Sequence, residues 1–440
     1  MNPTETTLAL ISLGCPKNLV NSEEMLSLLS EAGYDFTDDC AQADAVIINT
    51  CAFIESAKAE AIDRILEVAA LREENPALKI IVTGCLAQRY SRDIRAELPE
   101  VDGIIGTGSY SEVVTVLEQV LSGEKPTCCG NINFALKDTS RMVSTGPAWA
   151  YIRIAEGCDN HCAYCIIPAL RGKFRSRTKE SIIEEAKALC AAGVKELIIV
   201  AQDITHYGTD LYGHHELAGL LRELCRLDFT WIRLHYLYPE EVDDELIDVI
   251  AREEKIVKYL DIPIQHINDG ILKRMNRRST GAEIRSLFRK LRERIPGVVL
   301  RTSLIAGLPG EGEAEFEELC TFLREAKIER AGVFPFSPEE GTVAAAMDDR
   351  CSTEEAEERA RQCMEIQAEI MDEFNETLLG RELDVLVMGY EEDGTPWGRS
   401  EYDSPDIDSR VVFSGEAQPG DFVRVRITDP DDGELIGELI

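Results

Sequence analysis

The sequence predicts an α/β chain made of an open parallel α/β domain (residues 5–125), a partial parallel β/α barrel (144–373) and a small antiparallel β-barrel (375–440). Strand-like apolar runs alternate with helical patterns through the first two parts, which favours parallel sheets. Short alternating runs with turn signals then take over, which is typical of a small barrel. A three-cysteine stretch also directly follows a strand-like run, where parallel sheets place functional groups.

The first part repeats one pattern, an apolar run that ends near a cysteine and is followed by a helical pattern. The apolar runs are residues 8–13, 45–48 and 79–82. The cysteines are Cys15, Cys51 and Cys85, and each step has the length of one parallel crossover unit. The carboxyl ends of parallel strands meet at one edge of the sheet, so all three thiols are expected to face one crevice.

Three cysteines at equivalent strand ends indicate a metal cluster. The alternative is three buried core residues, because free cysteine is among the most buried residue types. The adjacent Gly14 and Gly84 are expected to let a bulky cluster approach the backbone. The sequence therefore favours a three-thiolate cluster site in this part.

The cysteines outside this group and the 158–165 stretch do not lie at equivalent strand ends. Packing roles are predicted for Cys40, Cys190, Cys225, Cys320 and Cys363. No role is assigned to Cys128 and Cys129, because neighbouring side chains diverge. They lie at the start of residues 126–147, which are predicted to be a linker because Pro126, Gly130, Gly146 and Pro147 interrupt any periodicity.

The second part contains six apolar runs with helical patterns between them. The runs are residues 151–155, 196–201, 230–236, 259–262, 298–305 and 332–335. Helical patterns include residues 179–191 and 282–294. This alternation predicts a parallel β/α barrel or partial barrel with its chemistry at the carboxyl ends of the strands.

The first of these runs leads into Cys158, Cys162 and Cys165, a C-x3-C-x2-C triplet that includes Tyr164. Three cysteines do not complete the four-coordinate site that structural zinc requires. They suffice for three irons of a 4Fe–4S cluster and leave the fourth iron open to a substrate or cofactor. The spacing also occurs in zinc sites, so the strand context decides for iron and sulfur.

Polar residues follow the other strands of this part. Gln202 and Asp203 close the second run, His235 closes the third, Gln265 and His266 follow the fourth, and residues 307–311 follow the fifth. Each has an ordinary alternative as a helix cap or a tight turn, and their shared location favours a site. The basic segment 171–177 is either a solvated loop or a contact for a carboxylate or a polypeptide substrate.

Residues 352–372 are predicted to form an amphipathic connecting helix before the third part. Strands are expected at 383–388, 410–413 and 422–427, with turns at 393–394 and 419–421. Small barrels of this size often bind RNA through basic and aromatic faces. Residues 375–440 contain five arginines and 17 acidic residues. This excess of negative charge favours a basic protein partner and argues against nucleic acid.

The whole chain is acidic, with 46 Lys and Arg against 81 Asp and Glu and a net charge of −35. Such a protein repels polyanions, although acidity can also serve solubility alone. No apolar run approaches the roughly 18 residues of a membrane span. No Lys or Arg precedes the apolar start, so a secretory signal is not expected. Fourteen cysteines in a chain of this length suggest metal sites in a reducing, cytoplasmic setting.

Taken together, these motifs resemble the methylthiotransferases of the radical S-adenosylmethionine (SAM) superfamily over nearly the whole chain. The N-terminal matches are residues 12–18, 49–51 and 83–85. The barrel matches are residues 158–165, 201–203, 261–266 and 301–311, and residues 375–440 are similar to a TRAM domain. Residues 165–172, 237–239 and 398–408 look more like the RimO-type branch, which modifies an aspartate of ribosomal protein S-twelve. Asn21 departs from the family, where an acid is expected.

The resemblance implies two 4Fe–4S clusters and SAM as cofactors. Cys158, Cys162 and Cys165 would hold the catalytic cluster and Cys15, Cys51 and Cys85 the second cluster. SAM would be bound by Gln202, Asp203 and Gln265. The implied reaction inserts sulfur and a methyl group at the aspartate β-carbon of S-twelve, free or within the small ribosomal subunit. The alternatives are methylthiolation of a transfer-RNA adenosine and a non-catalytic iron–sulfur protein.

Overall fold

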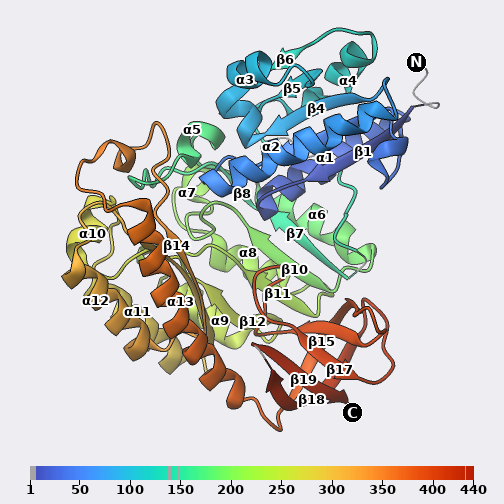
Figure 1. The fold of residues 1–440 in the computed structure, drawn as a ribbon. Helices are drawn as coiled ribbons and strands as arrows, with labels where there is room; N and C mark the ends of the chain where they lie inside the picture. The colour runs from blue at the N-terminus through green and yellow to red at the C-terminus, as the bar shows by residue number, and fades with distance from the viewer. Residues whose placement is uncertain (1–5, 137–139, 147, 432) are drawn as a thin grey trace. The chain divides into compact units, whose positions relative to one another are not determined.

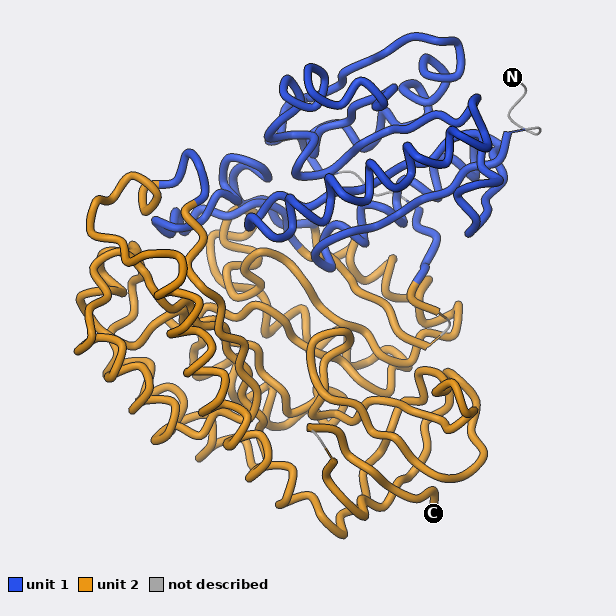
Figure 2. Tube along the Cα trace, in the orientation of Figure 1, with its two compact units in different colours: residues 1–144, 155–177, 339–342 blue, residues 145–154, 178–338, 343–440 orange. Residues whose placement is uncertain are grey.

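The structure is a computed structural model of the 440-residue chain and describes residues 6–136, 140–146, 148–431 and 433–440. Glu5, which begins the first predicted part, and Pro147 of the predicted linker lie outside the described residues, as do linker residues 137–139. Figure 2 shows two compact units: residues 1–144, 155–177 and 339–342 form unit 1, and residues 145–154, 178–338 and 343–440 form unit 2. None of the helices in the described residues is both long and apolar enough to span a membrane.

Unit 1 is built on one parallel six-stranded sheet (Figure 1). Its strands in spatial order are β2 (Asp35–Phe36), β1 (Thr7–Ser12), β3 (Ala45–Thr50), β4 (Lys79–Gly84), β5 (Gly103–Ile105) and β6 (Thr127–Cys128). The three predicted strands are β1, β3 and β4. The others are two or three residues long, too short for a periodic pattern. Strand β6 falls within the predicted linker, so that segment also contributes an edge strand.

Helices cover both faces of this sheet. Its helices are α1 (Pro16–Glu31), α2 (Glu55–Ala70), α3 (Cys85–Glu97), α4 (Val113–Leu121) and α5 (Ile167–Arg171). Side chains of α2, α3 and α5 form one apolar cluster with β3 and β4, and side chains of α1 and α4 form another with β1, β3 and β4. All six residues of β3 are buried, as expected of a strand covered on both sides.

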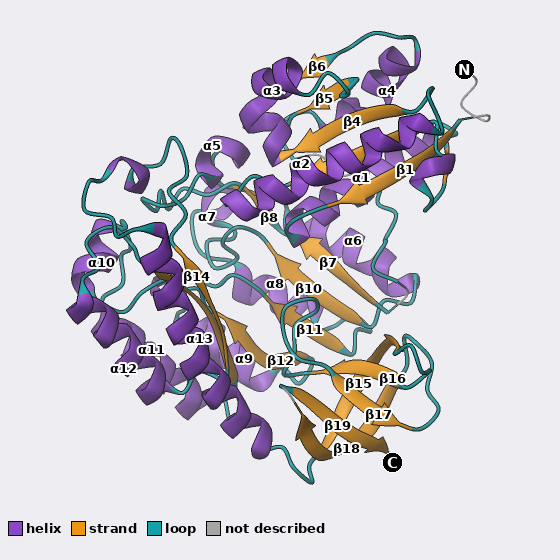
Figure 3. Cartoon of the chain, viewed as in Figure 1, coloured by secondary structure: helices purple, strands orange, loops and turns teal. Residues whose placement is uncertain are grey.

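Unit 2 contains a second parallel six-stranded sheet, which confirms the predicted partial barrel (Figure 3). Its strands in spatial order are β14 (Arg330–Pro335), β13 (Val299–Ala306), β12 (Ile256–Asp261), β11 (Trp231–Leu234), β10 (Glu196–Val200) and β7 (Trp149–Arg153). The helices of unit 2 are α6 (Lys179–Ala191), α7 (Thr209–Tyr212), α8 (Leu217–Leu224), α9 (Asp244–Arg252), α10 (Asp269–Arg274), α11 (Gly281–Arg294), α12 (Glu313–Ala326) and α13 (Thr353–Glu376).

Local chemistry explains where several helices begin. Thr178 accepts the Ser181 amide at the start of α6, and Thr280 forms a capping box with Glu283 at the start of α11. Ser352 caps α13, which covers the predicted 352–372 helix. A two-stranded antiparallel pair, β8 (Ala155–Glu156) and β9 (Arg175–Ser176), belongs to unit 1.

The C-terminal residues form the predicted small barrel. Its strands are β15 (Glu382–Tyr390), β16 (Pro396–Ser400), β17 (Val411–Ser414), β18 (Phe422–Asp431) and β19 (Glu434–Leu439). The barrel is closed in the order β15-β16-β17-β19-β18. Strands β17 and β19 pair in parallel, whereas β15 with β16, β15 with β18, β16 with β17, and β18 with β19 pair antiparallel. Buried Val, Leu, Ile and Phe side chains fill its interior.

The loop after β16 attaches this barrel to the parallel sheet of the same unit. Ser404 Oγ lies 2.9 Å from His235 Nε2, directly after β11. Tyr259 of β12 donates its hydroxyl to Asp408 at 2.5 Å. Ser404, His235 and Tyr259 are buried and Asp408 is half-buried, so the loop packs against the interior of unit 2.

Candidate functional site

The three N-terminal cysteines lie where the sequence predicts them, at carboxyl ends of neighbouring parallel strands. Cys15 lies between β1 and α1, Cys51 follows β3, and Cys85 begins α3 directly after β4. Cys51 and Cys85 are buried, and Cys15 is half-buried. Strands β1, β3 and β4 are consecutive neighbours, so one edge of one sheet carries all three thiols.

Buried amides bind these strand ends together. Asn18 donates its side-chain amide to the carbonyls of Leu13 and Thr50, both at 3.0 Å. Asn49 donates to the Asn18 carbonyl at 2.8 Å, and the Thr50 hydroxyl donates to the Thr83 carbonyl at 2.5 Å. The polar residues around the cysteines therefore hold the loops that carry them.

The two glycines beside the cysteines are also fixed by backbone conformation and local packing, and their predicted role in letting a cluster approach stays a prediction. Gly14 and Gly84 have φ angles of +84° and +93°. A Cβ on Gly14 would lie 2.7 Å from Cys51 Cβ, and one on Gly84 would lie 2.4 Å from the Thr50 carbonyl oxygen. Both are therefore required by backbone conformation and by close packing of the next strand end.

The three thiols differ in how their surroundings shift their pKa values. Burial is the largest effect on the pKa of Cys15 and raises it, but Lys17 and Arg171 outweigh burial and the pKa lies below that of an ordinary thiol. Burial and the neighbouring Cys15 and Cys85 raise the pKa of Cys51 to about 12. The pKa of Cys85 is raised by burial, against the opposing effect of Arg171.

Arg171, the last residue of α5, enters this N-terminal site. Its Nη2 lies 3.5 Å from Cys85 Sγ and also donates to the side-chain oxygen of Asn18. Its Nη1 donates to Asn21 Oδ1 at 2.8 Å and lies 3.4 Å from Glu156 Oε2. Only 3% of Arg171 is exposed. The solvated-loop interpretation of segment 171–177 is therefore wrong for this residue, and no periodicity in the sequence signals its partner.

The second triplet lies in a tightly bonded loop of unit 1. The Cys158 amide donates to the Gly172 carbonyl at 3.2 Å, and the Cys165 amide donates to the Cys162 carbonyl at 3.0 Å. His161 has a φ of +49°, which lets the chain reverse between the first two cysteines. Cys158 and Cys162 are each 6% exposed, and Cys165 is half-buried.

The backbone just before Cys158 is sterically restricted. Gly157 has a φ of +84°, and a Cβ there would lie 2.1 Å from the Lys173 carbonyl oxygen. Asn160 Nδ2 lies 3.5 Å from Cys158 Sγ, within range of an N–H···S hydrogen bond. The loop backbone is therefore tightly packed before Cys158, and the Asn160 amide lies next to the Cys158 sulfur.

The polar residues proposed to bind a cofactor lie in unit 2. Asp203 is 1% exposed, and its carboxylate accepts the Thr205 hydroxyl at 2.5 Å and the His206 amide at 3.2 Å. This agrees with the alternative in which Asp203 caps the loop after β10. Gln202 directly precedes it, and Gln265, with a φ of +71°, lies in the loop after β12.

The loop at 307–311 and its neighbours are also held by local bonds. Glu311 pairs with His266 at 3.2 Å and with Arg359 at 3.0 Å, and it accepts the Gly307 amide at 2.9 Å. Burial raises the pKa of Glu311 most strongly, but His266, the Gly307 amide and Arg359 outweigh it and hold the pKa below its usual range. This loop is therefore fixed by a buried carboxylate.

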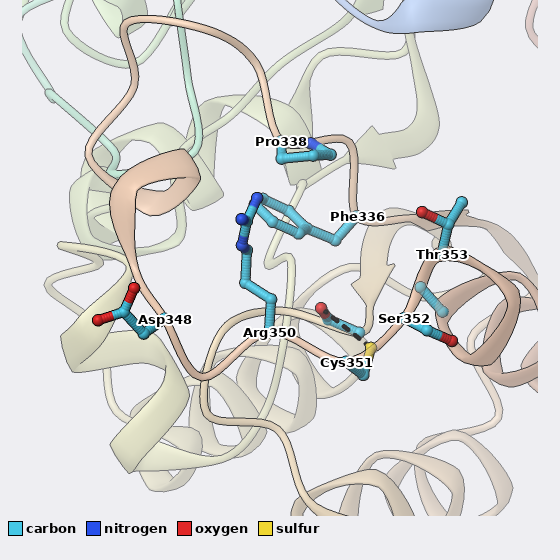
Figure 4. A pocket seen from close by; sticks show the side chains of 9 residues that line it. Phe336, Pro338, Asp348, Arg350, Cys351, Ser352 and Thr353 are labelled. Carbon is cyan, nitrogen blue, oxygen red and sulfur yellow. Dashed lines mark hydrogen bonds between the residues drawn. The ribbon is translucent and has the colours of Figure 1, made fainter.

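A hollow of about 280 Å³ in unit 2 contains none of the cysteines of the two triplets and none of Gln202, Asp203 and Gln265, although Gly307 of the predicted 307–311 loop lines it (Figure 4). It lies near the end of β14 and the start of α13, and Cys351 Sγ approaches the Gly307 carbonyl there at 3.6 Å. Its lining residues are Gly307, Phe336, Pro338, Asp348, Arg350, Cys351, Ser352, Thr353 and Ala356.

Comparison with protein families finds matches in three parts of the chain. Residues 7–106 match the uncharacterised protein family UPF0004, residues 152–323 match the radical SAM superfamily, and residues 379–440 match the TRAM domain. The parallel sheets, the closed C-terminal barrel and the cysteine triplet after β7 thus define a protein of the radical SAM class.

Relatives that match the full length of the chain identify its family within this class. The chain is 48% identical over 446 residues to the ribosomal protein uS12 methylthiotransferase RimO of Geobacter sulfurreducens, covering all of both chains. It is 48% identical to the RimO of Lachnoclostridium phytofermentans, covering 97% of this chain and 98% of that one. The chain belongs to the RimO family of ribosomal protein uS12 (S-twelve) methylthiotransferases, which confirms the resemblance seen in its motifs.

Solved structures support the fold. The radical SAM methyltransferase TsrM from Kitasatospora setae, with cobalamin and a 4Fe–4S cluster bound, aligns with a TM-score of 0.55 at 14% identity. The alignment covers 86% of this chain and 80% of that chain. At this level of identity the likeness concerns the fold.

Proposed function

We propose that this protein transfers a methylthio group to the β-carbon of an aspartate in ribosomal protein uS12, with SAM and two 4Fe–4S clusters as cofactors. The observation that carries the proposal is the full-length similarity to RimO proteins in a chain with two cysteine triplets in one unit. The reaction takes place in the cytoplasm, where ribosomal proteins are made and assembled.

The loop triplet suits a 4Fe–4S cluster that binds SAM. Cys158, Cys162 and Cys165 would hold three irons, and thiolates are the ligands such clusters use. The donor from Asn160 to the Cys158 sulfur supports this assignment, because N–H groups that face cluster sulfurs are a common way of adjusting these centres. When bound, this cluster and SAM supply the one-electron chemistry needed to break an unactivated C–H bond.

The strand-end triplet suits a second cluster. Cys15, Cys51 and Cys85 are close enough to affect one another's pKa, and in Cys51 this effect adds to burial. Three thiolates crowded in a buried site repel one another, and a bound cationic iron cluster would relieve that repulsion. Arg171 already opposes the repulsion from the protein side.

SAM would be oriented by polar groups at the strand ends of the partial barrel. Gln202 and Gln265 are proposed contacts for polar groups of SAM. Asp203 is retained as the third, and its carboxylate also holds the loop through Thr205 and His206. A substitution at Asp203 would therefore disturb the loop and the contact together.

The charge of the chain supports a basic protein substrate. The net charge is −35, and the C-terminal barrel contains few arginines. Four of these are paired with acids: Arg399 with Glu196, Arg410 with Glu391 and Glu434, Arg424 with Asp384, and Arg426 with Glu382 and Glu438. Nucleic-acid affinity depends on neutralising phosphates, and paired arginines do this poorly.

The substrate is tested by the mass of uS12 from cells with and without this gene. The expected result is a methylthio mass increment on one aspartate that disappears in the deletion strain and returns with the wild-type gene. The same strains supply transfer RNA for nucleoside analysis. A methylthioadenosine that depends on this gene, with unmodified uS12, would replace the proposal with the transfer-RNA alternative.

The clusters are tested by iron and sulfide content after anaerobic reconstitution. The wild-type chain is expected to bind about eight irons, and Cys158→Ala and Cys51→Ala should each lose about four. Cys225→Ala, a buried cysteine of the packing group, is the matched control and should keep all the iron. Full iron content in Cys51→Ala would exclude the second cluster.

A further inference from the structure

The guanidinium of Arg171 is a buried positive charge at the N-terminal cysteines. It lies 3.5 Å from Cys85 Sγ, and 3% of the residue is exposed. Arginine keeps its proton in proteins, so this charge is permanent. Burial excludes water that would screen it, and its effect on nearby sulfur is therefore large.

The partners of Arg171 leave much of this charge uncompensated at the sulfur. Two of them, Asn18 and Asn21, are neutral amides. Its carboxylate partner is Glu156, at 3.4 Å from Nη1, while Nη2 is the atom that faces Cys85. The positive end of this ion pair is thus directed at the thiol.

The same arginine lies at the sheet edge that carries the three thiols of the N-terminal site. Its Nη2 approaches Cys85 Sγ and also donates to Asn18, whose side-chain amide binds the carbonyl of Thr50, next to Cys51. A buried positive charge beside these sulfurs would stabilise an added electron on a cluster that the sulfurs bind. Hydrogen bonds and charge near the sulfurs are among the factors that set cluster potentials.

We propose that Arg171 raises the reduction potential of the second cluster, and that the neutral Asn21 preserves this effect. The inference rests on the proposed second cluster at Cys15, Cys51 and Cys85. Arg171 lies in α5, six residues after Cys165, so the segment that carries one cluster places a charge at the other. Arg171 is a positioning residue here, because it acts through the sulfur of Cys85.

Asn21 offers a substitution of nearly equal size. Asn21→Asp places a carboxylate 2.8 Å from Nη1, which keeps the hydrogen bond and neutralises the guanidinium. A purely structural Arg171 would be held at least as well by an aspartate, since charge-assisted hydrogen bonds are the stronger ones. A lower potential in this variant therefore identifies the electrostatic role.

The experiment is an anaerobic redox titration followed by electron paramagnetic resonance. The full chain carries Cys158→Ala, so that about four irons on the second cluster remain. Asn21→Asp, Arg171→Gln and Arg171→Lys are compared in this background. Lys173→Gln is the matched control, because Lys173 is an exposed cation in the same basic segment.

We expect Asn21→Asp and Arg171→Gln to lower the midpoint potential of the second cluster. Arg171→Lys keeps a positive charge and should lower this potential less than Arg171→Gln does. A tenfold change in the reduced-to-oxidised ratio corresponds to about 59 mV for one electron. Lys173→Gln should titrate like the parent. Unchanged midpoints in Asn21→Asp and Arg171→Gln, with four irons bound, would overturn this inference alone. A parent without that iron would overturn the proposed second cluster and this inference with it.

Discussion

Arg399 of β16 and Glu196 of β10 form a buried ion pair in which Nη2 and Oε2 are 2.5 Å apart. Arg233 of β11 occupies the other oxygen of Glu196 at 2.7 Å. One carboxylate thus joins the C-terminal barrel to the parallel sheet within unit 2. Burial raises the pKa of Glu196 most strongly, but the two guanidinium groups outweigh burial and lower it.

Replacing Glu196 should strongly destabilise unit 2. Glu196→Gln leaves two buried guanidinium groups without their counter-charge. Removing one partner of a buried ion pair lowers the free energy of unfolding by about 3–5 kcal/mol. Urea unfolding of the full chain at neutral pH measures this loss. Glu382→Gln removes a partner of Arg426 at an exposed pair, and its cost should be much smaller, because solvent screens exposed ion pairs. Equal costs for the two variants would contradict a special role for Glu196.

Gly157 should be necessary for the loop triplet. In Gly157→Ala the new Cβ lies 2.1 Å from a backbone carbonyl of Lys173, and the residue has a φ of +84°. The loop must shift, and the chain should lose about four of its eight irons on reconstitution. Gly193→Ala is the matched control, because its φ is +96° but nothing lies within 4 Å of its Cβ. Iron loss in both variants would point to backbone strain instead of the clash.

The pair of His206 and Glu241 should make stability depend on pH. The hydrogen bond with Glu241 raises the pKa of His206, so its stabilisation is complete below about pH 6.5 and is lost as pH rises through the raised value. Burial raises the pKa of Glu241, but His206 outweighs it and the pKa is lowered. The contribution of Glu241 is therefore present above about pH 4.3 and lost as pH falls through its lowered pKa.

His206→Gln should therefore reduce the melting temperature most between about pH 4.5 and 6.5, and least near pH 9. The effect should remain below about 1 kcal/mol, because the pair is partly exposed. Thermal unfolding at several pH values measures it. His214→Gln, which removes the more exposed partner of Glu216, should have a smaller effect. A loss that does not vary with pH would contradict the ion-pair explanation.

In cluster-free protein, the N-terminal cysteines should react at different rates. Cys51 has a pKa of about 12 and Cys15 has a lowered pKa, so Cys15 carries much more thiolate near pH 8. Iodoacetamide should therefore label Cys15 first, as measured by peptide mass spectrometry over time. Arg171→Gln should slow the labelling of Cys15, because it removes a charge that stabilises this thiolate. Equal labelling of both cysteines would contradict the predicted difference.

Local patterns in the sequence predict the long strands, the order of the three parts and the position of Cys15, Cys51 and Cys85 at strand ends. Periodicity reports which side chains of one segment are buried, and a strand of five or six residues is long enough to show it. Strands of two or three residues, such as β2 and β6, are not. The spacing of Cys158, Cys162 and Cys165 is equally local, so it too can be recognised from sequence.

Tertiary structure decides the contacts between segments far apart in the chain. Arg171 meets Cys85 across 86 positions, and Arg399 meets Glu196 across 203. Neither pair is indicated by its own segment, because a buried arginine and an exposed one look alike in sequence. Their partners are set by where α5 and β16 pack, and that packing depends on the sum of many weak apolar contacts over the whole chain. The sequence pattern alone thus determines which thiols are grouped, and the fold determines which charges surround them.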